Sequence, residues 1–123
     1  SKLKTLSVPK YIEIIKPLGF FDFTKLEKNA LCVITDSGTV PEETLYFGKP
    51  CVTIRDSTER PETIEAGSNI LSGLNSEDIF QCVKQMTSIV PNWKWDLSLG
   101  DGKTASKVVN IVRGKLERRI IEM

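Results

Sequence analysis

The sequence predicts an α/β fold built on a parallel sheet, and two features carry this prediction. Short apolar runs alternate along the chain with amphipathic stretches of helical period. Strand–helix alternation of this kind is typical of βαβ units, whose crossovers are right-handed. The chain has 123 residues, of which 40% are hydrophobic, so one domain with a buried core is expected over residues 1–123.

The first half of the chain contains three apolar runs that predict strands, at residues 11–16, 31–35 and 51–54. The last two are continuously apolar, which favours strands buried on both faces of a sheet. Helices are expected at residues 21–29 and 40–47. The second helix has Pro41 and two glutamates in its first turn, and Gly48 is placed to end it.

The second half predicts a short helix at residues 61–66 and a small strand at 69–71. A helix follows at 77–87, with Ser76 as its cap and apolar residues at a 3.6-residue period. After a loop in which Trp93 and Trp95 are expected to pack, the last helix is predicted from Thr104 to Ile121.

Charge and composition exclude several function classes. Seventeen basic and sixteen acidic residues leave a net charge of +1, which provides no general attraction to nucleic acid or to a membrane surface. The last helix is locally basic, which favours a solvated face over a nucleic-acid patch; its basic residues are Arg113, Lys115, Arg118 and Arg119. No segment has the length and apolarity of a membrane span.

The cysteines and the missing histidine narrow the chemistry further. Cys32, Cys51 and Cys82 form no CxxC pair, so buried, reduced thiols in a cytoplasmic protein are expected. The chain has no histidine, which excludes a histidine base or metal ligand within it. We expect no metal and no cofactor. The start at Ser1, rather than at a methionine, suggests a piece of a longer protein.

The segment from Thr35 to Glu43, TDSGTVPEE, predicts an anion site. A buried strand ends there, a Ser37–Gly38 turn follows, and a helix begins. The unpaired amides of such a turn and the helix dipole favour a phosphate, which Gly38 would allow to approach closely. Alternatively, Asp36 and Ser37 only cap the helix, as they do at many strand–helix junctions.

The loop after the next strand, RDSTERPE at residues 55–62, adds a second candidate at the same edge of the sheet. Arg60 could bind a diphosphate with bidentate geometry. The alternative is an exposed ion pair of Arg60 with Glu59 or Glu62.

Two further groups could contact a nucleotide. Of the adjacent Glu42 and Glu43, which cannot form a facing pair, one could accept hydrogen bonds from ribose hydroxyls, although both also suit a helix start. One ring of Phe20, Phe21 and Phe23 could stack on a base, although core packing is the commoner role of such rings.

The segments TDSGTVPEE, FGKP and RDSTERPETIEAG, in this order and spacing, resemble the non-hydrolysing UDP-N-acetylglucosamine 2-epimerases. The upstream PLGFFDF and the late GDGKTASKVVNIV resemble further segments of that family. The resemblance implies a GT-B fold of two Rossmann-like halves, with the nucleotide sugar between them. This chain would be the second, C-terminal half, and a full-length protein is expected to be a homodimer.

The resemblance also implies roles for six residues. Ser37 and Gly38 would hold the diphosphate, Arg60 would reach the phosphates, and Glu43 would bind the ribose. Phe23 would lie against uracil, with Pro17 near the base. The family reaction eliminates UDP across the first two sugar carbons and adds it back. Its base and acid lie in segments absent here, so binding of a UDP-sugar is expected of this chain, and turnover is not.

One departure concerns Thr39 and Pro41, which stand where the family usually has glycine and glutamine. This variant resembles a branch that acts on UDP-linked deoxy-sugars, including the step to UDP-N-acetyl-L-fucosamine. Two alternatives to the isomerase remain open. One is the nucleotide-binding half of a GT-B glycosyltransferase, and the other is a UDP-binding module without catalysis.

Overall fold

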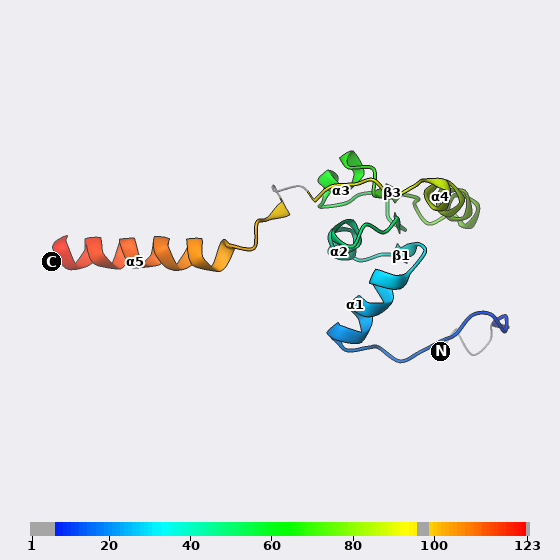
Figure 1. Cartoon of the computed structure of the whole chain (residues 1–123), viewed down its shortest axis with the longest axis horizontal. Coiled ribbons are helices and arrows are strands. Elements are labelled where there is room, and N and C mark those ends of the chain that lie inside the picture. Colours follow the sequence, from blue (N-terminus) through cyan, green and yellow to red (C-terminus); the bar gives the residue numbers. More distant parts are fainter. Residues whose placement is uncertain (1–6, 96–98, 123) are drawn as a thin grey trace.

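The computed structural model of the chain describes residues 7–95 and 99–122 and contains a small parallel sheet with helices around it. Figure 1 shows the order of the elements along the chain. The described elements are α1 (Phe20–Asn29), β1 (Val33–Thr35), α2 (Val40–Tyr46), β2 (Cys51–Thr53), α3 (Pro61–Glu65), β3 (Asn69–Leu71), α4 (Ser76–Ser88) and α5 (Thr104–Glu122).

The sheet has three strands in the order β1–β2–β3, all parallel. In register, Val33 lies beside Cys51, and Val52 beside Ile70. The ladder continues one step past the strands, where the amide of Ile54 donates to the carbonyl of Thr35 at 2.8 Å. Parallel strands place their carboxyl ends at one edge, so the loops after β1, β2 and β3 meet there.

Helices cover both faces of the sheet (Figure 1). Helices α2 and α3 pack on one side and α4 on the other, while α1 packs against α2. The centre of this arrangement is β2, all of whose residues are buried. The buried apolar core is small and consists of Val40, Leu45, Cys51, Val52 and Met86. Strand β1 is less enclosed than predicted, since Ile34 is 52% exposed at the free edge of the sheet.

The strand predicted at residues 11–16 is wrong. This segment runs as coil with a turn at its start, and Ile12 donates its amide to the carbonyl of Pro9 at 3.0 Å. Its apolar side chains are exposed, including Tyr11 at 88%. An alternating apolar pattern becomes a strand only where a neighbouring strand satisfies its backbone groups, and the described residues supply none to this segment.

Helix boundaries follow the sequence closely where a special residue marks them. Gly48 and Gly67 have φ angles of 67° and 82°, and they follow α2 and α3 as expected for left-handed residues past a helix end. The predicted cap of α4 is off by one residue. Asn75, not Ser76, is the N-cap, and its side chain accepts the amides of Glu77 and Asp78.

Helix α5 extends away from the sheet and its neighbouring helices (Figure 1). Its apolar side chains are exposed, and these are Val108, Val109, Ile111, Val112 and Leu116. These residues form an apolar stripe along one side of the helix, and nothing in the described part of the chain covers it. None of the helices described combines the length with the low charge that crossing a membrane would require.

Candidate nucleotide-binding site

The two loops that the sequence singled out lie against each other. A Cβ atom placed on Gly38 would meet the Glu59 carboxylate at 3.0 Å and the Arg55 guanidinium at 3.7 Å. The turn after β1 is therefore in contact with the loop after β2, at the carboxyl edge of the sheet. A side chain at Gly38 would enter this space and displace the Glu59 carboxylate.

The Ser37–Gly38 turn has fewer open amides than predicted. The Ser37 amide donates to the Thr35 hydroxyl at 3.0 Å, and the Ser37 hydroxyl accepts from the amides of Thr39 at 3.2 Å and Val40 at 3.5 Å. Ser37 thus caps the start of α2, as the alternative interpretation held. Among the described residues, only the Gly38 amide of this turn has no hydrogen-bond partner.

The Arg60 guanidinium lies over the start of α2. Its Nε donates to the carboxylate of Glu42, and its Nη1 donates to the carbonyl of Glu59 at 3.1 Å. The ion pair predicted as an alternative therefore forms, but its acid is Glu42 rather than Glu59 or Glu62. This pair ties the loop after β2 to the first turn of α2.

Glu59 instead pairs with Arg55, through two hydrogen bonds of 3.1 and 2.9 Å. The hydrogen bonds from Arg55 are the main cause of a lowered pKa of Glu59, so this carboxylate stays charged at neutral pH. It occupies the space over Gly38 that an incoming phosphate would need. Because the pair is exposed, it is weak, and another anion can replace Glu59 as the partner of Arg55.

A buried polar network holds the Arg60 backbone from below. Thr53 donates to the Asn69 side chain at 2.7 Å, and Asn69 donates to the Thr63 hydroxyl at 3.1 Å. Thr63 in turn donates to the carbonyl of Arg60 at 2.8 Å. Thr53, Thr63 and Asn69 are buried, so this network is sheltered from water and connects β2 and β3 to the loop.

The sequence interpretation missed these supporting residues, which are Thr35, Glu42, Arg55, Thr63 and Asn69. Their hydrogen bonds join segments up to 18 residues apart, as for Arg60 and Glu42. The one local signal was the presence of hydroxyl and amide side chains in otherwise apolar strands, at Thr53 and Asn69.

The proposed ribose and base contacts lie at the α1–α2 side of the site. Glu43 and Phe20 line a hollow of about 300 Å³ between α1 and α2. Phe23 lines a neighbouring hollow, of about 240 Å³, on the side of α1 that faces β1. Pro17 is exposed in the coil before α1, and no hydrogen bond or ion pair joins it to the other five residues.

Trp95 closes one side of the α1–α2 hollow, in agreement with the predicted packing role of both tryptophans. Its ring packs edge-on against Tyr46 at 5.6 Å, and its Nε1 donates to the carbonyl of Gly100 at 2.8 Å. Trp93 covers Gly67, whose added Cβ atom would lie 3.4 Å from its indole nitrogen.

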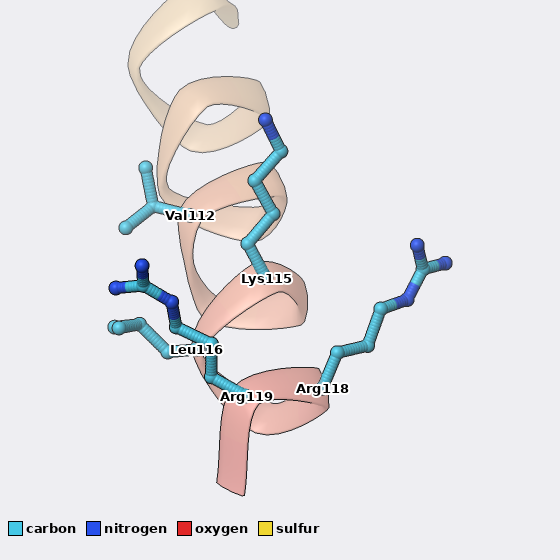
Figure 2. Close-up of a pocket in the computed structure, with 5 residues that line it drawn as sticks. All are labelled: Val112, Lys115, Leu116, Arg118 and Arg119. Atoms are coloured by element: carbon cyan, nitrogen blue, oxygen red, sulfur yellow. The ribbon is translucent and has the colours of Figure 1, made fainter. Parts of the chain in front are cut away.

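A second hollow, on α5, has no features of a binding site. It is formed by about two turns of a single exposed helix, from Val112 to Arg119, and no other described element contributes to it (Figure 2). Figure 2 shows Lys115 and Arg118 on one side of the helix, and Arg119 beside Val112 and Leu116 on the other. This exposed arrangement agrees with the predicted solvated basic face.

Comparison with known proteins adds independent evidence. The family model for UDP-N-acetylglucosamine 2-epimerase matches residues 2–113. The UDP-N-acetylglucosamine 2-epimerases of Methanococcus maripaludis and Methanocaldococcus jannaschii are each 47% identical to this chain, over 85% and 84% of its length. These alignments cover 28% of each relative, so the chain spans less than a third of the relatives it matches.

A solved structure extends the likeness to the fold. It is that of Methanocaldococcus jannaschii UDP-GlcNAc 2-epimerase in complex with UDP-GlcNAc and UDP, and it matches 90% of this chain and 30% of that chain. The TM-score is 0.82 at 44% identity. The match confirms the predicted fold class, a Rossmann-like parallel sheet flanked by helices as in one half of a GT-B fold.

The motifs that bring Gly38 and Arg60 together are thus the motifs that carried the resemblance in the sequence, and the family match covers both of them. It favours an isomerase relationship over the glycosyltransferase alternative. The deoxy-sugar branch suggested by Thr39 and Pro41 stays a prediction. By motif, sequence identity and fold together, the chain belongs to the UDP-N-acetylglucosamine 2-epimerase family.

Proposed function

We propose that this chain is the C-terminal, UDP-binding part of a longer UDP-N-acetylglucosamine 2-epimerase. The observation that carries the proposal is the contact between the turn at Gly38 and the loop that ends at Arg60. This contact places an open amide, two guanidinium groups and a position without a side chain at the carboxyl edge of a parallel sheet. That edge is where open α/β sheets bind their ligands.

The diphosphate would occupy the space now held by the Glu59 carboxylate. There the Gly38 amide can donate to a phosphate oxygen, and Arg55, released from Glu59, can donate two more hydrogen bonds. Arg60 keeps its contact with Glu42 and adds positive charge. Ser37, whose hydroxyl caps α2, would fix the turn and donate its own proton to the ligand.

The nucleoside would extend along α1 and α2. Glu43 would accept hydrogen bonds from the ribose hydroxyls, Phe23 would lie against uracil, and Pro17 would border the base. Glu43 and Phe23 line adjacent hollows of the α1–α2 side, which supports this direction. The solved relative from Methanocaldococcus jannaschii was obtained with UDP-GlcNAc and UDP, which supports a UDP-sugar as the ligand class.

In the proposed reaction, a base removes the proton on the second carbon of the sugar, and UDP departs from the first carbon. UDP then adds back as a proton is delivered to the opposite face. The cationic groups of this chain stabilise the departing diphosphate, where negative charge develops. The groups that move the proton come from outside these 123 residues, which contain no histidine.

The proposal includes three further expectations for the longer protein. A second, N-terminal domain completes the cleft. The full-length protein is a homodimer, and it acts in the cytoplasm. The described cysteines are free thiols, as a reducing compartment favours.

Titration of the chain with UDP tests the proposal. Arg60→Ala and Ser37→Ala are expected to weaken binding by roughly 1–3 kcal/mol each, the effect of losing a charge-assisted hydrogen bond. Arg113→Ala on the exposed helix α5 removes the same charge far from the site, so it is the matched control. Calorimetry at constant ionic strength measures all four affinities. Equal affinity of Arg60→Ala and Arg113→Ala would contradict the assignment.

A further inference from the structure

Glu27 is a buried acid that the proposed function does not use. It lies on the inner face of α1, is 3% exposed, and neither of its carboxylate oxygens has a hydrogen-bond partner among the described residues. An ionised carboxylate in such a place loses its hydration without compensation, which is costly. Native structures keep buried polar groups of this kind only where a proton or a partner satisfies them.

The neighbour that can satisfy Glu27 is Glu43 of α2. Helices α1 and α2 pack together, and Glu43 is the acidic side chain that acts on Glu27 across this contact. Two carboxyl groups this close hold one proton between them, because two negative charges at this separation repel strongly. Burial, first, and then the contact with Glu43 raise the pKa of Glu27 to about 7.

The remaining titratable groups that face this pair are two thiols. Cys32 comes from β1 and Cys51 from β2. Burial raises the pKa of the Cys32 thiol and raises that of Cys51 to about 11. Both are therefore neutral at physiological pH and bring no positive charge. A proton on the carboxyl pair is therefore what reduces the negative charge of Glu27 and Glu43.

The proton belongs on Glu27 rather than on Glu43. Glu27 is the more deeply buried of the two, whereas Glu43 is partly exposed and borders the α1–α2 hollow. Glu43 also lies in the first turn of α2, where the helix dipole favours a negative charge. Phe23 precedes Glu27 by one helical turn, and both line the neighbouring hollow on the β1 side of α1. Glu27 therefore lies between the proposed base contact, Phe23, and the proposed ribose contact, Glu43.

We propose that Glu27 is a positioning residue for the ribose: its protonated carboxyl donates a hydrogen bond to Glu43 and holds that side chain oriented to accept from the 2′ and 3′ hydroxyls. This inference rests on the proposed function, since it needs Glu43 to contact the ribose. When Glu27 loses its proton, the donor is replaced by a second negative charge, and the grip on the ribose weakens.

The test measures the chain's preference for UDP over 2′-deoxy-UDP between pH 6 and 8.5. The preference is the dissociation constant of 2′-deoxy-UDP divided by that of UDP, so a high ratio means a strong contact with the 2′ hydroxyl. The ratio cancels the ionisation of the diphosphate, which both ligands share. In the unmodified chain we expect the preference for UDP to fall roughly tenfold across this range, the scale of one lost charge-assisted hydrogen bond.

Three variants separate positioning from packing. Glu27→Gln carries a permanent donor, so it should keep the high ratio at every pH. Glu27→Leu has none, so its ratio should be low throughout. Glu65→Gln, on the exposed side of α3, is the matched control and should follow the unmodified chain. Thermal unfolding of each variant checks that it folds.

Carbon-13 NMR of the glutamate carboxyl groups is the second measurement. We expect one titration with a midpoint near 7 that disappears in Glu27→Gln. A ratio that is high but independent of both pH and residue 27, or a Glu27 midpoint near its usual 4.5, overturns the role of Glu27 alone. Absence of UDP binding, or binding that ignores the 2′ hydroxyl at pH 6, overturns the proposed function as well.

Discussion

At the scale of single residues, the site contains three acids whose charge is offset in different ways, by an arginine or by a proton. Glu59 pairs with Arg55, Glu42 pairs with Arg60, and Glu27 shares its environment with Glu43. The first pair is exposed, and we propose that a phosphate replaces Glu59 in it, whereas Glu27 is buried and is proposed to respond to pH. Ligand and proton thus act on different acids of the same small region.

The buried acid also affects folding. The pKa of Glu27 is about 7 in the folded chain and near 4.5 in the unfolded chain, so the folded state binds the proton more tightly. Its stabilising contribution is complete below pH 4.5 and is lost as the pH rises through 7. At about 1.4 kcal/mol for each pKa unit, the free energy of unfolding should fall by on the order of 3 kcal/mol.

Urea unfolding at pH 5 and pH 8 measures this loss, and Glu27→Gln should remove most of it. The pKa values of Glu59 and Asp101 are lowered, by Arg55 and by the Lys103 amide respectively, so these acids change stability only under more acidic conditions. The chosen range therefore isolates Glu27. An equal slope in the variant and the unmodified chain would show that Glu27 titrates normally.

At the scale of elements, the loop that presents Arg60 is positioned by its hydrogen bonds to the sheet. Thr63 is the central residue, because it accepts from Asn69 and donates to the carbonyl of Arg60. Thr63→Val keeps the shape but leaves the buried side-chain amide of Asn69 without its acceptor, and the Arg60 carbonyl keeps only the Thr63 backbone amide. We expect a loss of about 1–3 kcal/mol in the free energy of unfolding.

The matched control is Thr87→Val on α4, whose hydroxyl donates to carbonyls of its own helix, at Val83 and Lys84. This change should cost less than about 0.5 kcal/mol, as most surface substitutions do. Urea unfolding gives both values, and UDP titration shows whether the Arg60 loop is loosened. Equal costs for the two variants would mean that the network adds nothing beyond an ordinary threonine.

The elements could be predicted from the sequence where the determinant is local. Pro41 and Gly48 bracket α2, and Asn75 begins α4 one residue before the cap that was expected. The strand at residues 11–16 could not be predicted correctly, because pairing depends on a neighbour that a pattern does not reveal. For the same reason, the Ser37 turn was expected to have open amides, although Thr35 already accepts one of them.

The candidate site follows the same division. Gly38 and Arg60 were identified from their motifs, and the loops that carry them do lie together. The pairing of Glu42 with Arg60 and of Glu59 with Arg55, and the burial of Glu27, were not predicted, because ion pairing and desolvation depend on contacts between separate elements. The motifs thus indicated where a ligand could bind, whereas the ion pairs and the buried acid at this site became clear only from the three-dimensional structure.

At the scale of the whole molecule, the described chain is a small folded unit with a long appendage. Helix α5 leaves the sheet and points away from it (Figure 1). The first described segment, before α1, is also exposed and apolar, with Tyr11 and Ile14 at 88% and 60% exposure. The folded unit therefore derives its stability from β2 and the helices packed on it, and α5 adds little.

Removal of α5 tests this division. A chain that ends at Lys103 should have the same free energy of unfolding as the full 123 residues, within about 0.5 kcal/mol, because no other described element packs on the apolar stripe of the helix. The stripe residues Val108 and Leu116 are 52% and 55% exposed. A lone helix of this length is marginally stable in water.

Circular dichroism should therefore show that heating melts α5 gradually in the full chain, ahead of one cooperative transition that both chains share. A loss of more than about 2 kcal/mol on truncation would instead mean that α5 folds back onto the sheet in solution and that its stripe is covered there.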